Sequence, residues 1–187
     1  DIVFSWAPSW NTQPTGVTLS LRLSNQGKGM RPQEIYPLFT GGNLTSTYND
    51  RDPVSISIPA DAKKVEVVAL ITGHGGDVNN CAEFCDHEHH FTIGDQTWDY
   101  NLDDPGIDDA CATMSDSGTT PLQWGTWWYG RGGWCPGREV APFVADVTEK
   151  ATPGSTVSVS YKATRDGGEP KDGEGNIDMG SWLVISR

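Results

Sequence analysis

The chain has 187 residues and a formal net charge of −12, from 13 basic and 25 acidic side chains. This acidic balance argues against nucleic acid as a partner and against binding to an anionic membrane surface, because both require clustered cations. The longest apolar run is far too short to span a bilayer. The length fits a single domain over residues 1–187, and the 22 glycines and 12 prolines favour a loop-rich all-β protein over a helical one.

Short stretches of alternating apolar and polar residues predict β-strands along the chain. The clearest is 17–24, and the same pattern recurs at 55–58 and 156–161. Further strands are expected at 65–71, 91–93, 140–147 and 182–185. Short strands separated by turn residues, without helical periodicity, predict an antiparallel jelly-roll sandwich of about eight strands with long loops.

Three stretches are expected to be loops because turn-forming residues dominate them. Residues 26–52 are polar and punctuated by glycine and proline, 99–137 carry four tryptophans, and 165–176 are rich in glycine and charge. Loops of this length in a compact domain are commonly functional.

The four cysteines, Cys81, Cys85, Cys111 and Cys135, are even in number and include no Cys-x-x-Cys pair. In an acidic, tryptophan-rich chain this pattern indicates two disulfides and an exported protein, secreted or periplasmic. Their spacing does not suit a zinc ribbon.

All four histidines lie between residues 73 and 93. If 86–93 is one strand, His87 and His89 share the face that carries Phe91 and Ile93, and they lie side by side at the mouth of the sandwich. Two imidazoles at this spacing can bind one metal ion. The alternative is a polar strand end whose histidines make ordinary hydrogen bonds. His90 lies on the opposite face.

Two further features could carry chemistry. If Cys81 and Cys85 pair, they hold Glu83 rigidly, and a rigid carboxylate can act as a general acid or base or accept a hydrogen bond from a substrate. The alternative is an exposed glutamate on a structural loop. The aromatic faces of the second long loop suit the C–H faces of sugars, and the nearby Arg131 can make bidentate polar contacts; these aromatics could equally form a small core. The candidate sugar-binding residues are Trp124, Trp127 and Trp128.

Two motifs closely resemble the second domain of the peptide:N-glycosidase F family. They are Cys-Ala-Glu-Phe-Cys at 81–85 and Arg-Gly-Gly-Trp-Cys-Pro-Gly at 131–137, separated by the strand of His89 and followed by the strand at 156–161. The resemblance covers 55–187 well and 1–54 only loosely. It implies two disulfides, Cys81–Cys85 and Cys111–Cys135.

Members of that family have two eight-stranded jelly rolls side by side and hydrolyse the amide bond that joins a glycan to asparagine. The resemblance implies that Glu83 is an active-site glutamate and that Arg131 lies near it. The family's essential aspartate belongs to the first domain, which this chain does not match. We therefore expect a domain directed to a glycan or glycopeptide that is catalytically incomplete without a partner jelly roll. A non-catalytic carbohydrate-binding module is the alternative.

A more distant resemblance connects the histidine segment to copper monooxygenases of the peptidylglycine α-hydroxylating type, which belong to the same superfamily. Their second domain binds copper through His-x-His on a strand and a methionine near the last strand. His87 and His89 have that spacing, and Met179 lies just before the expected strand at 182–185. Imidazole and thioether ligands suit copper. The resemblance implies one copper ion as cofactor and copper binding as a further alternative function.

Overall fold

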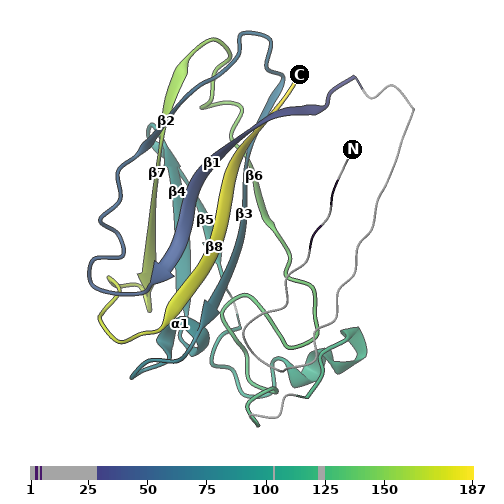
Figure 1. Cartoon of the computed structure of the whole chain (residues 1–187), viewed down its shortest axis with the longest axis vertical. Coiled ribbons are helices and arrows are strands. Elements are labelled where there is room, and N and C mark those ends of the chain that lie inside the picture. Colours follow the sequence, from purple (N-terminus) through teal and green to yellow (C-terminus); the bar gives the residue numbers. More distant parts are fainter. Residues whose placement is uncertain (1–2, 4, 6–28, 103, 122–124) are drawn as a thin grey trace.

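The structure, a computed structural model, describes residues 3, 5, 29–102, 104–121 and 125–187. In this part of the chain, eight strands form two four-stranded antiparallel sheets that pack face to face (Figure 1). One sheet has the order β1 (Pro32–Asn43), β8 (Asn176–Ser186), β3 (Lys64–His74), β6 (Phe143–Asp146). The other has the order β2 (Val54–Ser57), β7 (Thr156–Arg165), β4 (His87–Ile93), β5 (Gln96–Asn101). This order is that of a jelly roll and confirms the predicted fold class.

The core lies between the sheets, where alternate residues of each strand point inward. Strand β3 buries every second side chain from Val65 to Gly73, and β8 does so from Ile177 to Ile185. Most of these inward positions carry aliphatic side chains, which fill the space between two pleated surfaces. The largest fully buried apolar members are Leu44, Val65, Val67, Ile71, Phe91, Val147, Ile177, Leu183 and Ile185.

Strand β1 contradicts the expectation that residues 26–52 form a loop. Among the described strands, β1 lies at the edge of its sheet and pairs with β8 alone, and an edge tolerates the prolines that suggested a loop. Its register shifts between Pro37 and Thr40 and again between Thr40 and Gly42, which interrupts the alternation by which strands are recognised. Gly41 is required there, because a Cβ would lie 1.8 Å from the carbonyl oxygen of Ile177.

Strand β5 was also missed, since it begins inside a stretch of polar and aromatic residues. It forms a hairpin with β4 through Gly94 and Asp95, and Gly94 has a φ of +62° that favours glycine. Strand β6 is shorter than the expected 140–147. The expected strand at 17–24 and the candidate Trp124 lie outside the described residues.

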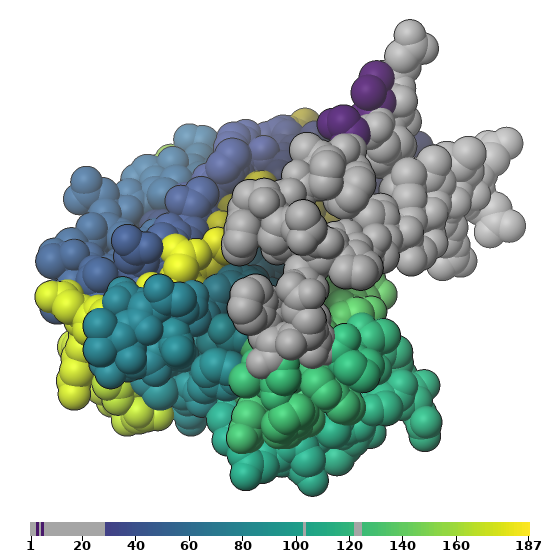
Figure 2. Space-filling view, turned by 60° about the horizontal axis from the view of Figure 1, so that its bottom comes forward, coloured from purple at the N-terminus to yellow at the C-terminus, as the bar shows by residue number. Residues whose placement is uncertain are grey.

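The loops at one end of the sandwich gather around a single helical turn, α1 (Cys81–Phe84). Figure 2, in which this end comes forward, shows the segment around α1 in teal beside the loop between β5 and β6 in green. The latter loop contains a short 3₁₀ helix, η1 (Ala112–Ser117). Among the described residues, no helix has the length and apolar character needed to cross a membrane.

Candidate active site at the glutamate turn

The turn α1 is fixed at both ends and from two neighbouring loops. The disulfide Cys81–Cys85 closes it, with the two Cα atoms 4.6 Å apart, and the second disulfide, Cys111–Cys135, ties the loop opposite, so both expected pairings are confirmed. The amide N–H of Ala82 donates to the carbonyl oxygen of Glu174 at 2.6 Å. On the other side, the N–H of Gly132 donates to the carbonyl oxygen of Glu83 at 2.7 Å. The backbone around Glu83 is therefore held by its own disulfide and by two separate segments.

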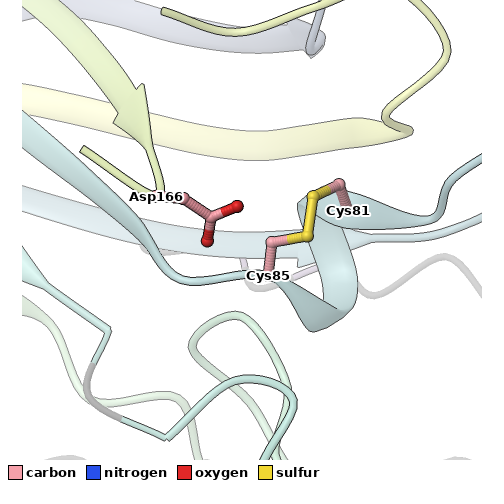
Figure 3. Close-up of side chains that lie close together, drawn as sticks. All are labelled: Cys81, Cys85 and Asp166. Carbon is pink, nitrogen blue, oxygen red and sulfur yellow. A yellow bond between two sulfur atoms is a disulfide. The ribbon is translucent and has the colours of Figure 1, made fainter. Parts of the chain in front are cut away.

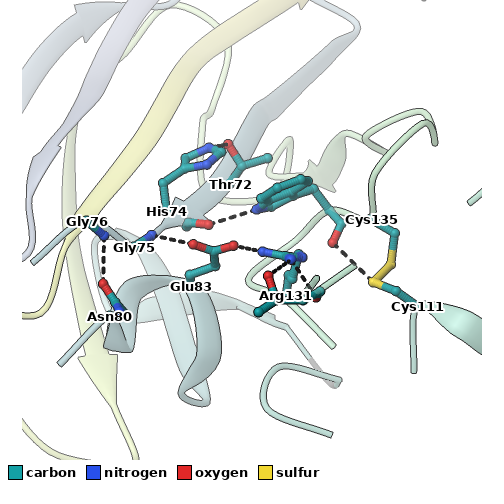
Figure 4. Close-up of polar contacts among 12 residues, drawn as sticks. Thr72, His74, Gly75, Gly76, Asn80, Glu83, Cys111, Arg131 and Cys135 are labelled. Carbon is teal, nitrogen blue, oxygen red and sulfur yellow. Dashed lines mark hydrogen bonds and ion pairs between the residues drawn. A yellow bond between two sulfur atoms is a disulfide. The ribbon is translucent and has the colours of Figure 1, made fainter. Parts of the chain in front are cut away.

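The Glu83 carboxylate has a defined partner at each oxygen (Figure 4). Oε2 accepts a hydrogen bond of 2.7 Å from the N–H of Gly75, and Oε1 forms an ion pair with Nη1 of Arg131. A Cβ at Gly75 would lie 2.7 Å from Oε2, so the absence of a side chain allows this contact. The Glu83 side chain is 15% exposed. Glu83 is thus held by two contacts, one of them to Arg131, and is still within reach of solvent.

Arg131 is the buried half of this ion pair, with a side chain that is 2% exposed. Its Nη2 donates to the carbonyl oxygen and the hydroxyl of Thr126, at 2.6 and 2.9 Å. Its guanidinium stacks 4.7 Å from the ring centroid of Trp134 and 5.2 Å from that of Phe84. Burial lowers the pKa of Arg131 to about 10, so it remains a cation at neutral pH. Among the residues that the structure describes, none bonds its Nε.

His74 is a site residue that the sequence analysis did not single out. Its ring lies 5.2 Å from that of Trp134, and Trp134 donates its indole N–H to the carbonyl oxygen of Gly73 at 2.8 Å. Nε2 of His74 contacts the Thr72 hydroxyl at 2.8 Å and lies 3.6 Å from Asp178. Burial lowers the pKa of His74, with Asp178 opposing and Arg131 reinforcing this shift. The Gly-His-Gly sequence just before the glutamate turn was the available signal.

His87 and His89 form a buried chain of hydrogen bonds that begins next to the glutamate turn. Nε2 of His87 bonds the carbonyl oxygen of Ala82 at 2.8 Å, and Nδ1 of His87 bonds Nε2 of His89 at 2.9 Å. Nδ1 of His89 bonds the hydroxyl of Tyr161 at 2.7 Å, and that hydroxyl lies 3.2 Å from the hydroxyl of Tyr48. The two histidines share the core-facing side of β4, as expected, and both are buried.

This chain of hydrogen bonds determines which nitrogen of each histidine ring carries the proton. The Ala82 carbonyl can only accept, so His87 donates from Nε2 and accepts at Nδ1. His89 must then donate from Nε2 and accept at Nδ1 from Tyr161. Burial lowers the pKa of His87 and lowers that of His89 further, which agrees with two neutral rings. All four ring nitrogens have protein partners, so a metal would have to displace some of these bonds.

Met179, the third expected copper ligand, lies on β8 in the other sheet, where it pairs with Ile71 and belongs to the apolar core. A different group of potential ligand atoms, Cys81, Cys85 and Asp166, lies within 4.8 Å among the described residues (Figure 3). Its two sulfurs are joined in the disulfide and are not thiolates. The copper site stays a prediction.

The tryptophans of the loop between β5 and β6 that the structure describes fall into two groups. Trp127 and Trp128 form a T-shaped pair with ring centroids 6.0 Å apart, and Trp128 is 37% exposed. Trp134, which was not among the expected sugar-binding residues, packs against Arg131 and His74 instead. The structure therefore brings Glu83, Arg131 and Trp134 into one site and leaves Trp127 and Trp128 outside this set of contacts.

The fold and the site define a jelly-roll domain in which a disulfide-closed turn presents a glutamate to a buried arginine. The family described as peptide-N-glycosidase F, C terminal, matches residues 43–184. The chain belongs to this family, which confirms the resemblance seen in the sequence.

Individual relatives agree with this assignment. The peptide-N(4)-(N-acetyl-β-D-glucosaminyl)asparagine amidase F of Elizabethkingia miricola is 30% identical over 115 residues, which make up 58% of this chain and 30% of the relative. A crystal structure of a peptide-N(4)-(N-acetyl-β-D-glucosaminyl)asparagine amidase has a TM-score of 0.64 at 21% identity, over 81% of this chain and 51% of that chain. PNGase F, a glycosylasparaginase from Flavobacterium meningosepticum, gives a TM-score of 0.58 with the same identity and coverage. The chain thus spans about half the length of these solved structures.

Proposed function

We propose that this chain is an exported, glycopeptide-directed domain that contributes one half of a site for cleaving the amide bond between a glycan and asparagine. The observation that carries the proposal is the ion pair between Glu83 and the buried Arg131, which both lie within the residues that the family matches. Two disulfides support an oxidising compartment, secreted or periplasmic.

The geometry of Glu83 favours a positioning role over the whole of the chemistry. Amide hydrolysis needs an activated water and an acid that protonates the leaving amine. One carboxylate supplies at most one of these functions at a time, and that of Glu83 already accepts from Arg131 and Gly75. Its partial exposure leaves it able to accept one more hydrogen bond, from a substrate N–H or hydroxyl. A partner jelly-roll domain supplies the second acid in this proposal.

The competing proposals use the chain differently. A non-catalytic carbohydrate-binding module would use the same aromatic and arginine surface without turnover, and the exposed Trp128 is the observation that favours it. A copper-binding domain would use His87 and His89 with Met179, at the cost of the hydrogen bonds described above.

Incubation with a denatured N-glycoprotein tests the proposal, read by the mass shift of the glycoprotein and the release of sugar. We expect background turnover by the 187-residue chain and cleavage when the partner jelly-roll domain is present. Glu83→Gln should then abolish cleavage, whereas Glu149→Gln, at an exposed position after β6, should not.

Efficient cleavage by the chain alone would refute the need for a partner domain. Glycan binding without cleavage, even with the partner present, would favour the binding module instead.

A further inference from the structure

The loop between β7 and β8 contains a buried carboxylate, Glu174, that the candidate site does not use. Its side chain is fully buried, and removing an ionised group from water is unfavourable unless the group is paired and hydrogen-bonded. Its Oε1 accepts from Nε and Nη2 of Arg165, at 2.8 and 2.5 Å, and its Oε2 accepts from the N–H of Lys171 at 2.8 Å. Both oxygens have partners within the protein, so Glu174 offers no surface to a substrate.

The backbone of this loop holds the segment that forms the glutamate turn. The carbonyl oxygen of Glu174 accepts from the N–H of Ala82 at 2.6 Å. Where the loop leaves β7, the N–H of Asp166 donates to the carbonyl oxygen of Asp86 at 2.8 Å. Figure 3 shows Asp166 beside the disulfide that closes α1. The loop is therefore bonded to the chain within α1 and directly after it.

The loop approaches the turn closely because a glycine follows Glu174. Gly175 has a φ of +101°, and a Cβ there would lie 2.4 Å from the carbonyl oxygen of His74 and 3.3 Å from the Cβ of Ala82. The Glu174 carbonyl is thus placed from two directions, by the packing of Gly175 and by the hydrogen bonds of the buried carboxylate.

Stability alone does not explain a buried ion pair of this kind. Replacing such a pair by apolar side chains of similar volume is often neutral or stabilising, because burial removes the hydration of both charges. Charge-assisted hydrogen bonds do provide a defined geometry. Arg165 is the last residue of β7 and lies opposite His87 of β4, so it orients the Glu174 carboxylate against the end of a sheet.

We propose that Glu174 is a positioning residue for Glu83. Its buried pair with Arg165 fixes the carbonyl that accepts from Ala82, and this sets the position of the turn. The inference rests on the proposed function, in which Glu83 is the group that contacts the substrate. Glu83 is then held from two sides, by Arg131 on the loop between β5 and β6 and by Glu174 on the loop between β7 and β8.

Hydrogen exchange of the Ala82 amide, followed by NMR in the 187-residue chain, tests the proposal. Glu174→Gln keeps the size of the side chain and removes its charge. Arg165 is partly exposed and keeps its contact with Asp166, so the variant leaves no isolated buried charge. We expect the exchange of Ala82 to become about tenfold faster relative to that of Val67, which is buried on β3, because a charge-assisted hydrogen bond is lost.

A double variant separates positioning from stability. Arg165→Met combined with Glu174→Leu removes both charges and should keep a similar melting temperature. Lys171 is exposed, so water can replace the acceptor that its N–H loses. Fast exchange of Ala82 in this folded variant would support the positioning role. Exchange as slow as in the unmodified chain would show that the ion pair does not place the turn, and it would overturn the proposal.

Asp172→Asn is the matched control in the same loop. The Asp172 carboxylate accepts from the N–H and the hydroxyl of Ser46, at 2.9 and 2.8 Å, and Ser46 follows β1. This variant should leave the exchange of Ala82 within about twofold of the unmodified chain, since it breaks no bond to the turn. A tenfold increase in Asp172→Asn as well would assign the effect to the whole loop and refute a specific role of Glu174.

Cleavage assays with the partner jelly-roll domain distinguish this inference from the proposed function. We expect Glu174→Gln to lower kcat about tenfold with little change in KM, because the residue does not touch the substrate and acts through Glu83. Cleavage that requires Glu83 but is unchanged in Glu174→Gln would refute the positioning role and preserve the function. An exchange of Ala82 that depends on Glu174, without cleavage under any condition, would support the control of the turn and refute the hydrolytic function.

Discussion

The hydrogen bonds of His87 make its replacement the most informative single perturbation. His87→Ala removes the donor to the Ala82 carbonyl and the acceptor for the His89 N–H, both inside the fold. Each buried group left without a partner costs about 1–3 kcal/mol, so the two together should cost about 2–6 kcal/mol. The loss should also loosen the turn that carries Glu83, because Ala82 directly precedes it.

Urea denaturation, followed by tryptophan fluorescence, measures this cost. We expect a large fall in the midpoint with an unchanged slope. His90→Ala is the matched control on the same strand. His90 lies on the outer face, where its ring contacts Asp99 and Thr164, and an exposed pair of this kind contributes at most about 1 kcal/mol.

His87→Gln should recover part of the stability, since an amide can both donate and accept. Equal costs for His87→Ala and His90→Ala would refute the reasoning.

Three further predictions follow from the same contacts. Because burial lowers the folded-state pKa values of His87 and His89, the unfolded chain binds protons first as the pH falls below about 6.5. The contribution of the two rings to stability is therefore complete above that pH and decreases below it; a denaturation midpoint independent of pH between 7 and 5 would contradict this. Replacing Cys111 and Cys135 together by serine should cost about 3 kcal/mol by the loop-entropy relation, measured as the difference in unfolding free energy from the unmodified chain; an unchanged value would contradict it. Because hydrogen bonds occupy all four ring nitrogens of His87 and His89, we expect that Cu(II) at pH 7 does not raise the melting temperature. The copper-site hypothesis instead predicts a rise that His87→Ala abolishes.

Sequence patterns predicted the fold well where strands alternate and poorly where they bend. The inward face of β4, with its two histidines ahead of Phe91 and Ile93, follows directly from a period of two. Strand β1 was not recognised because its prolines and register shifts remove that period, and an edge strand tolerates both. The disulfides were correctly paired only through the family resemblance, since spacing alone allows three connectivities.

The sequence named two residues of the candidate site but missed His74 and Trp134, and it did not show how the residues connect. Glu83 and Arg131 were both identified. Nothing in their separate motifs indicates that the Glu83 carboxylate forms an ion pair with the Arg131 guanidinium. His87 and His89 were placed side by side, but a metal and a mutual hydrogen bond require the same spacing. In the folded chain, the Ala82 carbonyl lies next to the His87 ring and the Tyr161 hydroxyl lies next to the His89 ring. These two neighbours determine which hydrogen bonds the ring nitrogens make in this structure.

The glycines around the turn explain why the site is assembled from such distant segments. A Cβ at Gly73 would lie 1.6 Å from the Ala82 carbonyl oxygen and 2.8 Å from Nε2 of His87, and one at Gly132 would lie 2.6 and 2.5 Å from the same two atoms. The N–H of Gly73 donates to the Gly132 carbonyl at 2.7 Å, so the two backbones are joined to each other. Both lie against the hydrogen bond between Nε2 of His87 and the Ala82 carbonyl. In the sequence these glycines indicate only flexible loops. In the fold they allow three backbones to approach one imidazole, and the Glu83–Arg131 pair depends on that approach, because Gly132 directly follows Arg131 and Ala82 directly precedes Glu83.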